Sequence, residues 1–186
     1  LNHAIFECLL ASAAFLKAKA KNYDPEILLD HQQREIIKLH IRVNQKHELI
    51  RSLLLTDRYA MNPDNKKGRV LLERAGLLID LYEQLNAVHF DYESIRQSLS
   101  GGKSLTLIAD LIRILAEEIE DLGRHVRTIK NIESRSKINS SFIADQKKLI
   151  AEMNHLNTEQ REFIRSVISN IDEIAQIIMA IRKSEI

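Results

Sequence analysis

The sequence predicts an all-α protein, an elongated antiparallel bundle of about five or six helices, several of them near 30 residues long. The first reason is composition, because 186 residues include only 5 Gly and 2 Pro, which break helices. The second reason is periodicity, because apolar residues recur at alternating steps of three and four along most of the chain. Helices of about 30 residues would each be about 45 Å long, and short loops would join them into one domain over residues 1–186.

The first expected helix runs from about residue 2 to residue 21, and the stretch NYDPE should end it. Asp24 is a good helix cap and Pro25 a good first helical residue, so a second helix is expected to start there. It should continue to about residue 57. Lys46 falls within its apolar stripe and marks a weak point or an edge.

Turn residues in MNPDNKKGR separate the second helix from a third, which is expected over residues 68–99. SGGKS should end that helix, with Gly101 in the left-handed conformation and Ser104 capping the next helix. The fourth helix has the most regular pattern. Its heptad seam consists of Leu105, Ile108, Ile112, Leu115, Ile119, Leu122, Val126 and Ile129.

Two further helices are expected after the polar stretch NIESRSKINSS. The fifth is shorter and covers about residues 140–156. Asn157 or Thr158 should cap the sixth, whose Ile-rich seam keeps the three-four spacing of a helix over five steps. The residues of this second seam are Ile164, Val167, Ile171, Ile174, Ile178 and Ile181.

Charge and cysteine content exclude several functional classes. A formal net charge of +1 provides no strong field for nucleic acid, so no nucleic-acid partner is expected. Cys8 is the single cysteine, which rules out an intrachain disulfide and fits a reducing compartment. No apolar run reaches the length of about 20 residues that a membrane span needs. Because the chain starts without Met inside an amphipathic pattern, we expect a domain excised from a longer protein.

Catalytic patterns are weak. Glu152 and His155 form one Glu-x-x-His pair, whereas a di-iron bundle needs two pairs and two more carboxylates, so no metal or cofactor is expected. Arg42 and His47 match a loose spacing of some helical ribonucleases, at a frequency that chance explains. Without a phosphate loop, zinc spacing or nucleophile elbow, no catalytic residue is expected and an enzyme is the remotest alternative.

An acidic run on the fourth helix is expected to be a solvated face opposite the heptad seam, with two i,i+4 pairs to basic residues. The acidic residues are Glu117, Glu118, Glu120 and Asp121, and the pairs are Glu120–Arg124 and Asp121–His125.

The stretch HFDY, residues 89–92, is the most unusual part of the third expected helix. Tyr92 falls on the apolar seam, so its ring should be buried and its hydroxyl needs a partner. His89 lies one turn earlier and can reach an adjacent helix, whereas Asp91 should point to solvent. The three side chains cannot converge on one helix face. A polar clamp inside a helix interface is therefore expected, with ligand contact as the alternative.

Two stretches resemble one protein family. FLKAKAKNYDPE, residues 15–26, is similar to the segment after the first membrane half of the fusaric-acid-resistance-like (FUSC) proteins, YccS/YhfK branch. ERAGLLIDLYEQLNAVHFDYESIRQSL, residues 73–99, is similar to a later helix of the same proteins, although Asn86, Ala87 and Val88 replace the Ser that often precedes the His. Residues 131–186 carry no recognised motif. The matching residues are Asp24, Pro25, Glu73, Arg74, Ala75, His89, Asp91 and Tyr92.

The resemblance implies a parent protein of the bacterial inner membrane with two membrane halves and an efflux role, for which aromatic carboxylic acids are the best-known substrates. This chain would be the cytoplasmic helical domain between the halves, structural or regulatory and without enzymatic activity. Transport residues would lie in the spans, so the matching residues should be structural. Expected partners are the membrane portion of the parent and, through leftover apolar stripes, another copy of the chain. The alternative is a signalling or scaffold bundle unrelated to transport.

Overall fold

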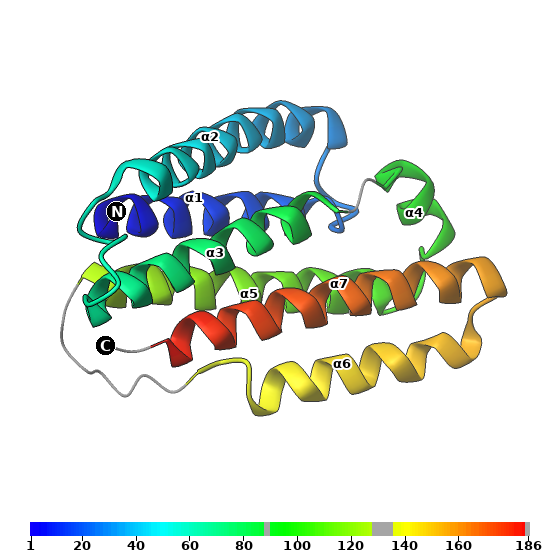
Figure 1. Ribbon diagram of the computed structural model, residues 1–186. Helices are drawn as coiled ribbons and strands as arrows, with labels where there is room; N and C mark the ends of the chain where they lie inside the picture. The colour runs from blue at the N-terminus through cyan, green and yellow to red at the C-terminus, as the bar shows by residue number, and fades with distance from the viewer. Residues whose placement is uncertain (88–89, 128–135, 185–186) are drawn as a thin grey trace.

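The computed structural model describes residues 1–87, 90–127 and 136–184, and these residues form seven α-helices and no strand (Figure 1). The predicted all-α class and the antiparallel packing are confirmed. The helices are α1 (Asn2–Lys21), α2 (Leu29–Thr56), α3 (Lys66–Asn86), α4 (Tyr92–Ser98), α5 (Ser104–Arg127), α6 (Ser140–Glu152) and α7 (Thr158–Lys183), and a 3-10 turn covers Met153–His155.

Helix α1 is the central element, because its apolar residues are distributed around most of its circumference. It packs antiparallel along α5 and also contacts α2 and α3. Gly123 of α5 allows this close approach, since a Cβ there would lie 3.3 Å from Leu10 Cδ2 and 3.4 Å from Leu9 Cβ. The described parts of the heptad seams of α5 and α7 are buried as predicted, and α2, α3 and α6 add further residues to the same core.

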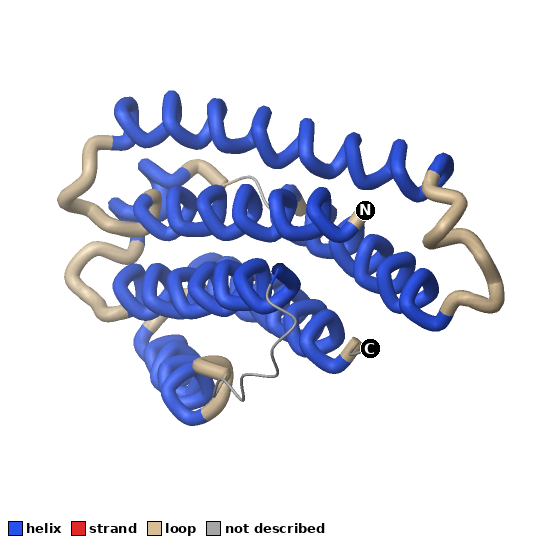
Figure 2. Tube along the Cα trace, turned by 90° about the vertical axis from the view of Figure 1, so that its left-hand side faces the viewer, coloured by secondary structure: helices blue, strands red, loops and turns tan. Residues whose placement is uncertain are grey.

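Helices α2 and α6 lie at opposite edges of the bundle, as the two views agree (Figures 1 and 2). α2 contacts α1 and, less extensively, α3, whereas α6 covers α5. Lys46 marks an edge as expected, and its ammonium pairs with Glu7 at 3.2 Å. One long side of α2 therefore faces away from the rest of the chain that the structure describes.

The start of α2 was predicted wrongly. The helix begins at Leu29, and neither Asp24 nor Pro25 belongs to it. The Asp24 carboxylate accepts a hydrogen bond from the Glu26 backbone N–H at 3.0 Å, which closes a local turn. The chain then stays non-helical through Leu28, whose backbone is extended.

The predicted helix over residues 68–99 is also wrong, because it is two helices. α3 ends at Asn86, and α4 starts at Tyr92. Gly101 then adopts the predicted left-handed conformation, with φ of 87°. Asn157 is the cap of α7, and it exchanges side-chain and backbone hydrogen bonds with Gln160 at 2.9 and 3.0 Å.

Candidate functional site

The two motif stretches contact each other at the end of α1. Residues 15–26 form the last turns of α1 and the turn after it, and residues 73–99 include most of α3 and all of α4. The rings of Tyr23 and Tyr92 meet edge to face with centroids 5.4 Å apart. Phe90 adds a second edge-to-face contact to Phe163 of α7, with centroids 4.7 Å apart. Segments distant in sequence thus share one aromatic junction.

The tyrosine hydroxyls are the polar part of this junction. The Tyr92 hydroxyl faces the polar side chains of Asn22 and Tyr23, which partly offset the effect of burial on its pKa. Burial raises the pKa of Tyr92, and it raises the pKa of Tyr23 well above its usual value. Both phenols are therefore neutral at physiological pH and act as hydrogen-bonding groups. Tyr92 therefore faces two polar side chains of the turn after α1. His89 lies outside the described residues, so the expected clamp between His89 and Tyr92 stays a prediction.

Arg96 fixes α4 across the end of α1. Its Nε donates to the carbonyl oxygen of Asn22 at 2.7 Å, its Nη1 to Ile27 at 2.6 Å and its Nη2 to Lys21 at 3.2 Å. Carbonyl groups at a helix end lack partners within the helix, and a cation near them also complements the helix dipole. Sequence reasoning missed this residue. The available signal was its position four residues after Tyr92, on the same side of a helix.

Asp91 has a different role from the one expected. It is exposed, as predicted, but its carboxylate caps α4 by accepting from the Ser94 backbone N–H at 3.2 Å and from the Ser94 hydroxyl at 2.7 Å. These hydrogen bonds from Ser94 lower the pKa of Asp91. The residue therefore holds the start of α4 and does not point away unpaired.

Lys19 lies on the inner side of the aromatic junction. Its ammonium donates to the carbonyl oxygen of Leu85 at the end of α3 and lies 5.2 Å from the centroid of the Phe15 ring. Burial lowers its pKa from 10.5 to about 8. A cavity of about 30 Å³ lies beside it, between α1, α3, α5 and α7. That volume suits one or two water molecules and is far below the size of a typical ligand pocket.

The remaining motif residues lie at the other end of the bundle. Glu73 is exposed on α3, and Ala75 is buried. Arg74 donates to the Ser184 hydroxyl at 3.1 Å and to the Ser184 carbonyl oxygen, just after α7. The motif residues therefore do not converge on a single site, since Arg74 ties α3 to α7 far from Tyr92.

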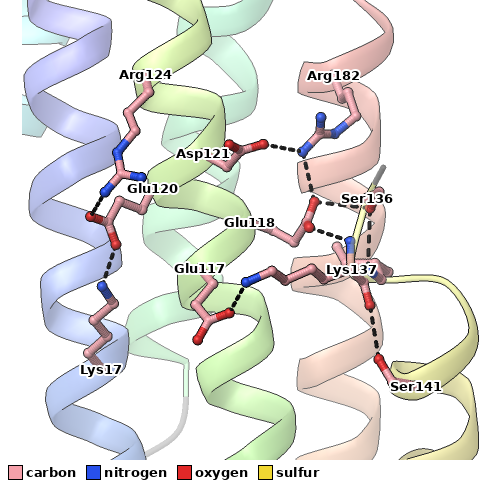
Figure 3. A network of polar contacts seen from close by, with 11 residues as sticks. Lys17, Glu117, Glu118, Glu120, Asp121, Arg124, Ser136, Lys137, Ser141 and Arg182 are labelled. Atoms are coloured by element: carbon pink, nitrogen blue, oxygen red, sulfur yellow. Dashed lines mark hydrogen bonds and ion pairs between the residues drawn. The ribbon is translucent and has the colours of Figure 1, made fainter. Parts of the chain in front are cut away.

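The acidic run of α5 is not the solvated face that was expected. Glu118 is buried, and its carboxylate accepts from Arg182 at 2.7 Å, from the Ser136 hydroxyl at 3.0 Å and from the Lys137 backbone N–H (Figure 3). Its neighbours keep exposed partners, with Glu117 pairing with Lys137. The carboxylate of Glu118 thus joins α5, α7 and the segment before α6, because these elements fold over it.

The other acidic residues of α5 form the i,i+4 pairs that the sequence predicts. Glu120 pairs with Arg124 at 2.6 Å, and Asp121 lies 3.5 Å from His125, which are the predicted i,i+4 pairs. Glu120 also binds Lys17 of α1, so this carboxylate adds a contact between the two central helices (Figure 3).

A buried thiol and imidazole lie between α1 and α2. Cys8 Sγ is 3.2 Å from His47 Nε2, and both side chains are fully buried. Burial raises the pKa of Cys8 to about 12 and, with the nearby Arg51 charge, lowers the pKa of His47 to about 4. Both groups are neutral at physiological pH, so the thiol lacks the thiolate character of a nucleophile. Arg42 is exposed on α2 and takes no part in this contact.

The described residues contain no group of three or more His, Cys, Asp or Glu that could hold a metal ion. The polar contacts instead join helix ends and helix faces. The fold and the junction define an all-α bundle domain in which two sequence motifs lock the end of a central helix.

The chain belongs to the family described as FUSC-like inner membrane protein yccS, whose model matches residues 1–184. The match includes residues 131–184, in which no motif was recognised. No curated protein and no solved structure matches the chain. In the ranges that the structure describes, every helix is too short or too polar to span a lipid bilayer.

Proposed function

We propose that this chain is a non-enzymatic domain of an inner-membrane efflux protein, that it lies on the cytoplasmic side, and that it relays movement of α1 to the bundle. Membership of the FUSC-like inner membrane protein family supports this proposal over an unrelated signalling or scaffold bundle. Aromatic carboxylic acids are proposed as substrates of the membrane portion alone. The membrane portion would be the partner of this domain.

The observation that carries the proposal is the set of hydrogen bonds that Arg96 donates to the carbonyl oxygens of Lys21 and Asn22 at the end of α1 and of Ile27 in the segment before α2. Hydrogen bonds from a charged donor are each worth about 1.5–3 kcal/mol, so α1 cannot shift without α4 or without losing them. α4 begins at Tyr92, a short connection after α3 ends at Asn86, and Phe90 in that connection packs on Phe163 of α7. A displacement of α1 therefore reaches α3, α4 and α7 together.

The positions of the two chain ends support a connection to the membrane portion at one end of the bundle. The amino group of Leu1 lies 3.6 Å from Asp57, just after α2, and Ser184 contacts Arg74 near the start of α3. Both ends therefore lie at the same end of the bundle, opposite α4 (Figure 1). α1 spans the distance between that end and the Arg96 contact.

The test uses the full-length membrane protein with Arg96→Met. We expect cells carrying this variant to lose resistance to aromatic acids, with membrane insertion and protein abundance unchanged. Arg165→Met is the matched control, because Arg165 is an exposed arginine on α7. A protein lacking residues 1–186 should also insert without conferring resistance. Wild-type resistance from either inserted protein, Arg96→Met or the deletion, would refute the relay role.

A further inference from the structure

We propose that the outer face of α2 is a self-complementary surface through which two copies of this chain associate, with their α2 helices antiparallel about a two-fold axis at Ile41. This inference goes beyond the proposed function, because dimerisation does not depend on efflux.

The outer face of α2 carries exposed apolar residues among charged ones. α2 lies at the edge of the bundle, and among the described helices its substantial contacts are with α1 and α3. The exposed fractions on its other side are 59% for Ile37, 54% for Ile41 and 80% for Leu55. Large apolar side chains that recur on one exposed face are a feature of interaction surfaces.

The spacing of the face is that of a helix–helix seam. Arg34, Ile41, Glu48 and Leu55 follow one another at intervals of seven residues, so they fall on one stripe of α2. Ile37 precedes Ile41 by one turn on the same side. α2 thus carries a second seam on the face opposite its buried Val43 and Ile50.

The charges identify a second copy as the occupant. Arg34 lies one heptad before Ile41 and Glu48 one heptad after it, so an antiparallel pair centred on Ile41 brings Arg34 opposite Glu48 of the second copy. The symmetry makes this opposite-charge pair twice. Within the chain, Glu48 Oε1 accepts a hydrogen bond from Arg51 at 2.6 Å, and both side chains are exposed enough to solvent for Glu48 to bind a second cation.

The apolar stripe continues to Leu55, which lies 14 residues after Ile41 and is 80% exposed. The two-fold axis at Ile41 places Leu55 opposite Ile27 of the second copy, in the non-helical segment before α2.

The size of the face predicts a reversible dimer. A helix of 28 residues is about 42 Å long and its outer strip about 10 Å wide, near 400 Å² per copy in projection. Interfaces of this order are at the small end of the range for specific complexes, so we expect a dissociation constant in the micromolar range.

The test is sedimentation equilibrium of the 186-residue chain from low to high micromolar concentration. Arg34→Glu and Glu48→Arg should each weaken the dimer about tenfold or more, and the double variant should restore it, because the opposite charges are only exchanged. Ile41→Asp should abolish association, whereas Ile150→Asp, at a 48% exposed position on α6, should not. Far-UV circular dichroism checks that each variant is folded.

A second experiment reports on the axis itself. Ile41→Cys should form a disulfide-linked dimer under mild oxidation, and Ile150→Cys should not, while Cys8 stays buried in both. A chain that is monomeric at all concentrations overturns the proposal. A dimer that is insensitive to Ile41→Asp, or that the charge exchange fails to restore, overturns it as well.

Discussion

Arg182 and Glu118 hold their charged groups 2.7 Å apart although 64 residues separate them in the chain. The Glu118 side chain is almost completely buried, and the same carboxylate also accepts from Ser136 and Lys137. An anion in this setting is stable only while its partners are in place. The contact therefore makes the position of α5 depend on α7 and on the start of α6.

Glu118→Ala should destabilise the protein by about 3–5 kcal/mol, because Arg182, Ser136 and the Lys137 backbone N–H lose the buried carboxylate that they share. Glu117→Ala is the matched control one position away. It removes an exposed pair with Lys137 and should cost less than about 1 kcal/mol. Urea denaturation followed by circular dichroism measures both values, and equal small losses would show that Glu118 is not buried as described.

Tyr92→Phe should reduce the free energy of unfolding by about 1–3 kcal/mol, because Tyr23 and Asn22 lose the hydroxyl that they face in a buried junction. Tyr59→Phe removes the same hydroxyl from an exposed ring and should change stability very little. The difference between the two variants isolates the junction from the general effect of removing a phenol oxygen. No difference would mean that the Tyr92 hydroxyl is solvated.

Asp91→Ala should cost about 1 kcal/mol, because α4 loses the side chain that caps its first turn. Asp91→Asn retains an oxygen that can accept from Ser94 and should recover most of that loss. Glu93→Ala, two positions further and exposed, should stay within about 0.5 kcal/mol of the wild type. Chemical denaturation of the three variants distinguishes a cap from a solvated carboxylate.

His47 should make stability fall in mild acid. Its folded-state pKa is lowered from 6.5 to about 4, so above pH 6.5 both the folded and the unfolded states are neutral. Between pH 6.5 and pH 4 the unfolded state binds a proton that the folded state excludes, and up to about 3 kcal/mol of stability is lost. His47→Leu should lose this part of the pH dependence between pH 7 and pH 4, whereas the exposed His155→Gln should retain it. Parallel stability curves for wild type and His47→Leu would contradict the assignment.

Local periodicity was sufficient to predict α5 and α7, because the side that is apolar in sequence is the side that is buried. The bounds of α1 were also predicted, but its burial on most sides was not, because one apolar stripe was expected. Periodicity could not predict the break between α3 and α4. Leu85 and Tyr92 both keep the three-four spacing, so the pattern continues across a segment that is not one helix. The break depends on contacts from elsewhere, such as Lys19 bonding the Leu85 carbonyl oxygen and Phe90 packing on Phe163.

For the charged residues, too, contacts between distant parts of the chain decide what the local pattern leaves open. The helical register places Glu118 beside the buried seam, three residues after Leu115 and four before Leu122, whereas Glu117 faces the opposite way. The polar partners that complete its burial, Ser136 and Arg182, are 18 and 64 positions away from Glu118 and could not be read from this register. Local preference also misplaced the start of α2. Asp24 does accept a backbone hydrogen bond, but it closes a turn, and Arg96 holds the Ile27 carbonyl oxygen in the non-helical segment that follows.

The central position of α1 has a consequence for the synthesis of the protein. Its main packing partner, α5, is completed about 100 residues after α1 ends. At about 5–20 residues per second, translation leaves α1 without that partner for about 5–20 s. During this interval α2 and α3 can cover parts of a helix that is apolar on most sides, but the side that meets α5 stays uncovered. Exposed apolar surface of this kind makes the nascent chain prone to aggregation until α5 has left the ribosome.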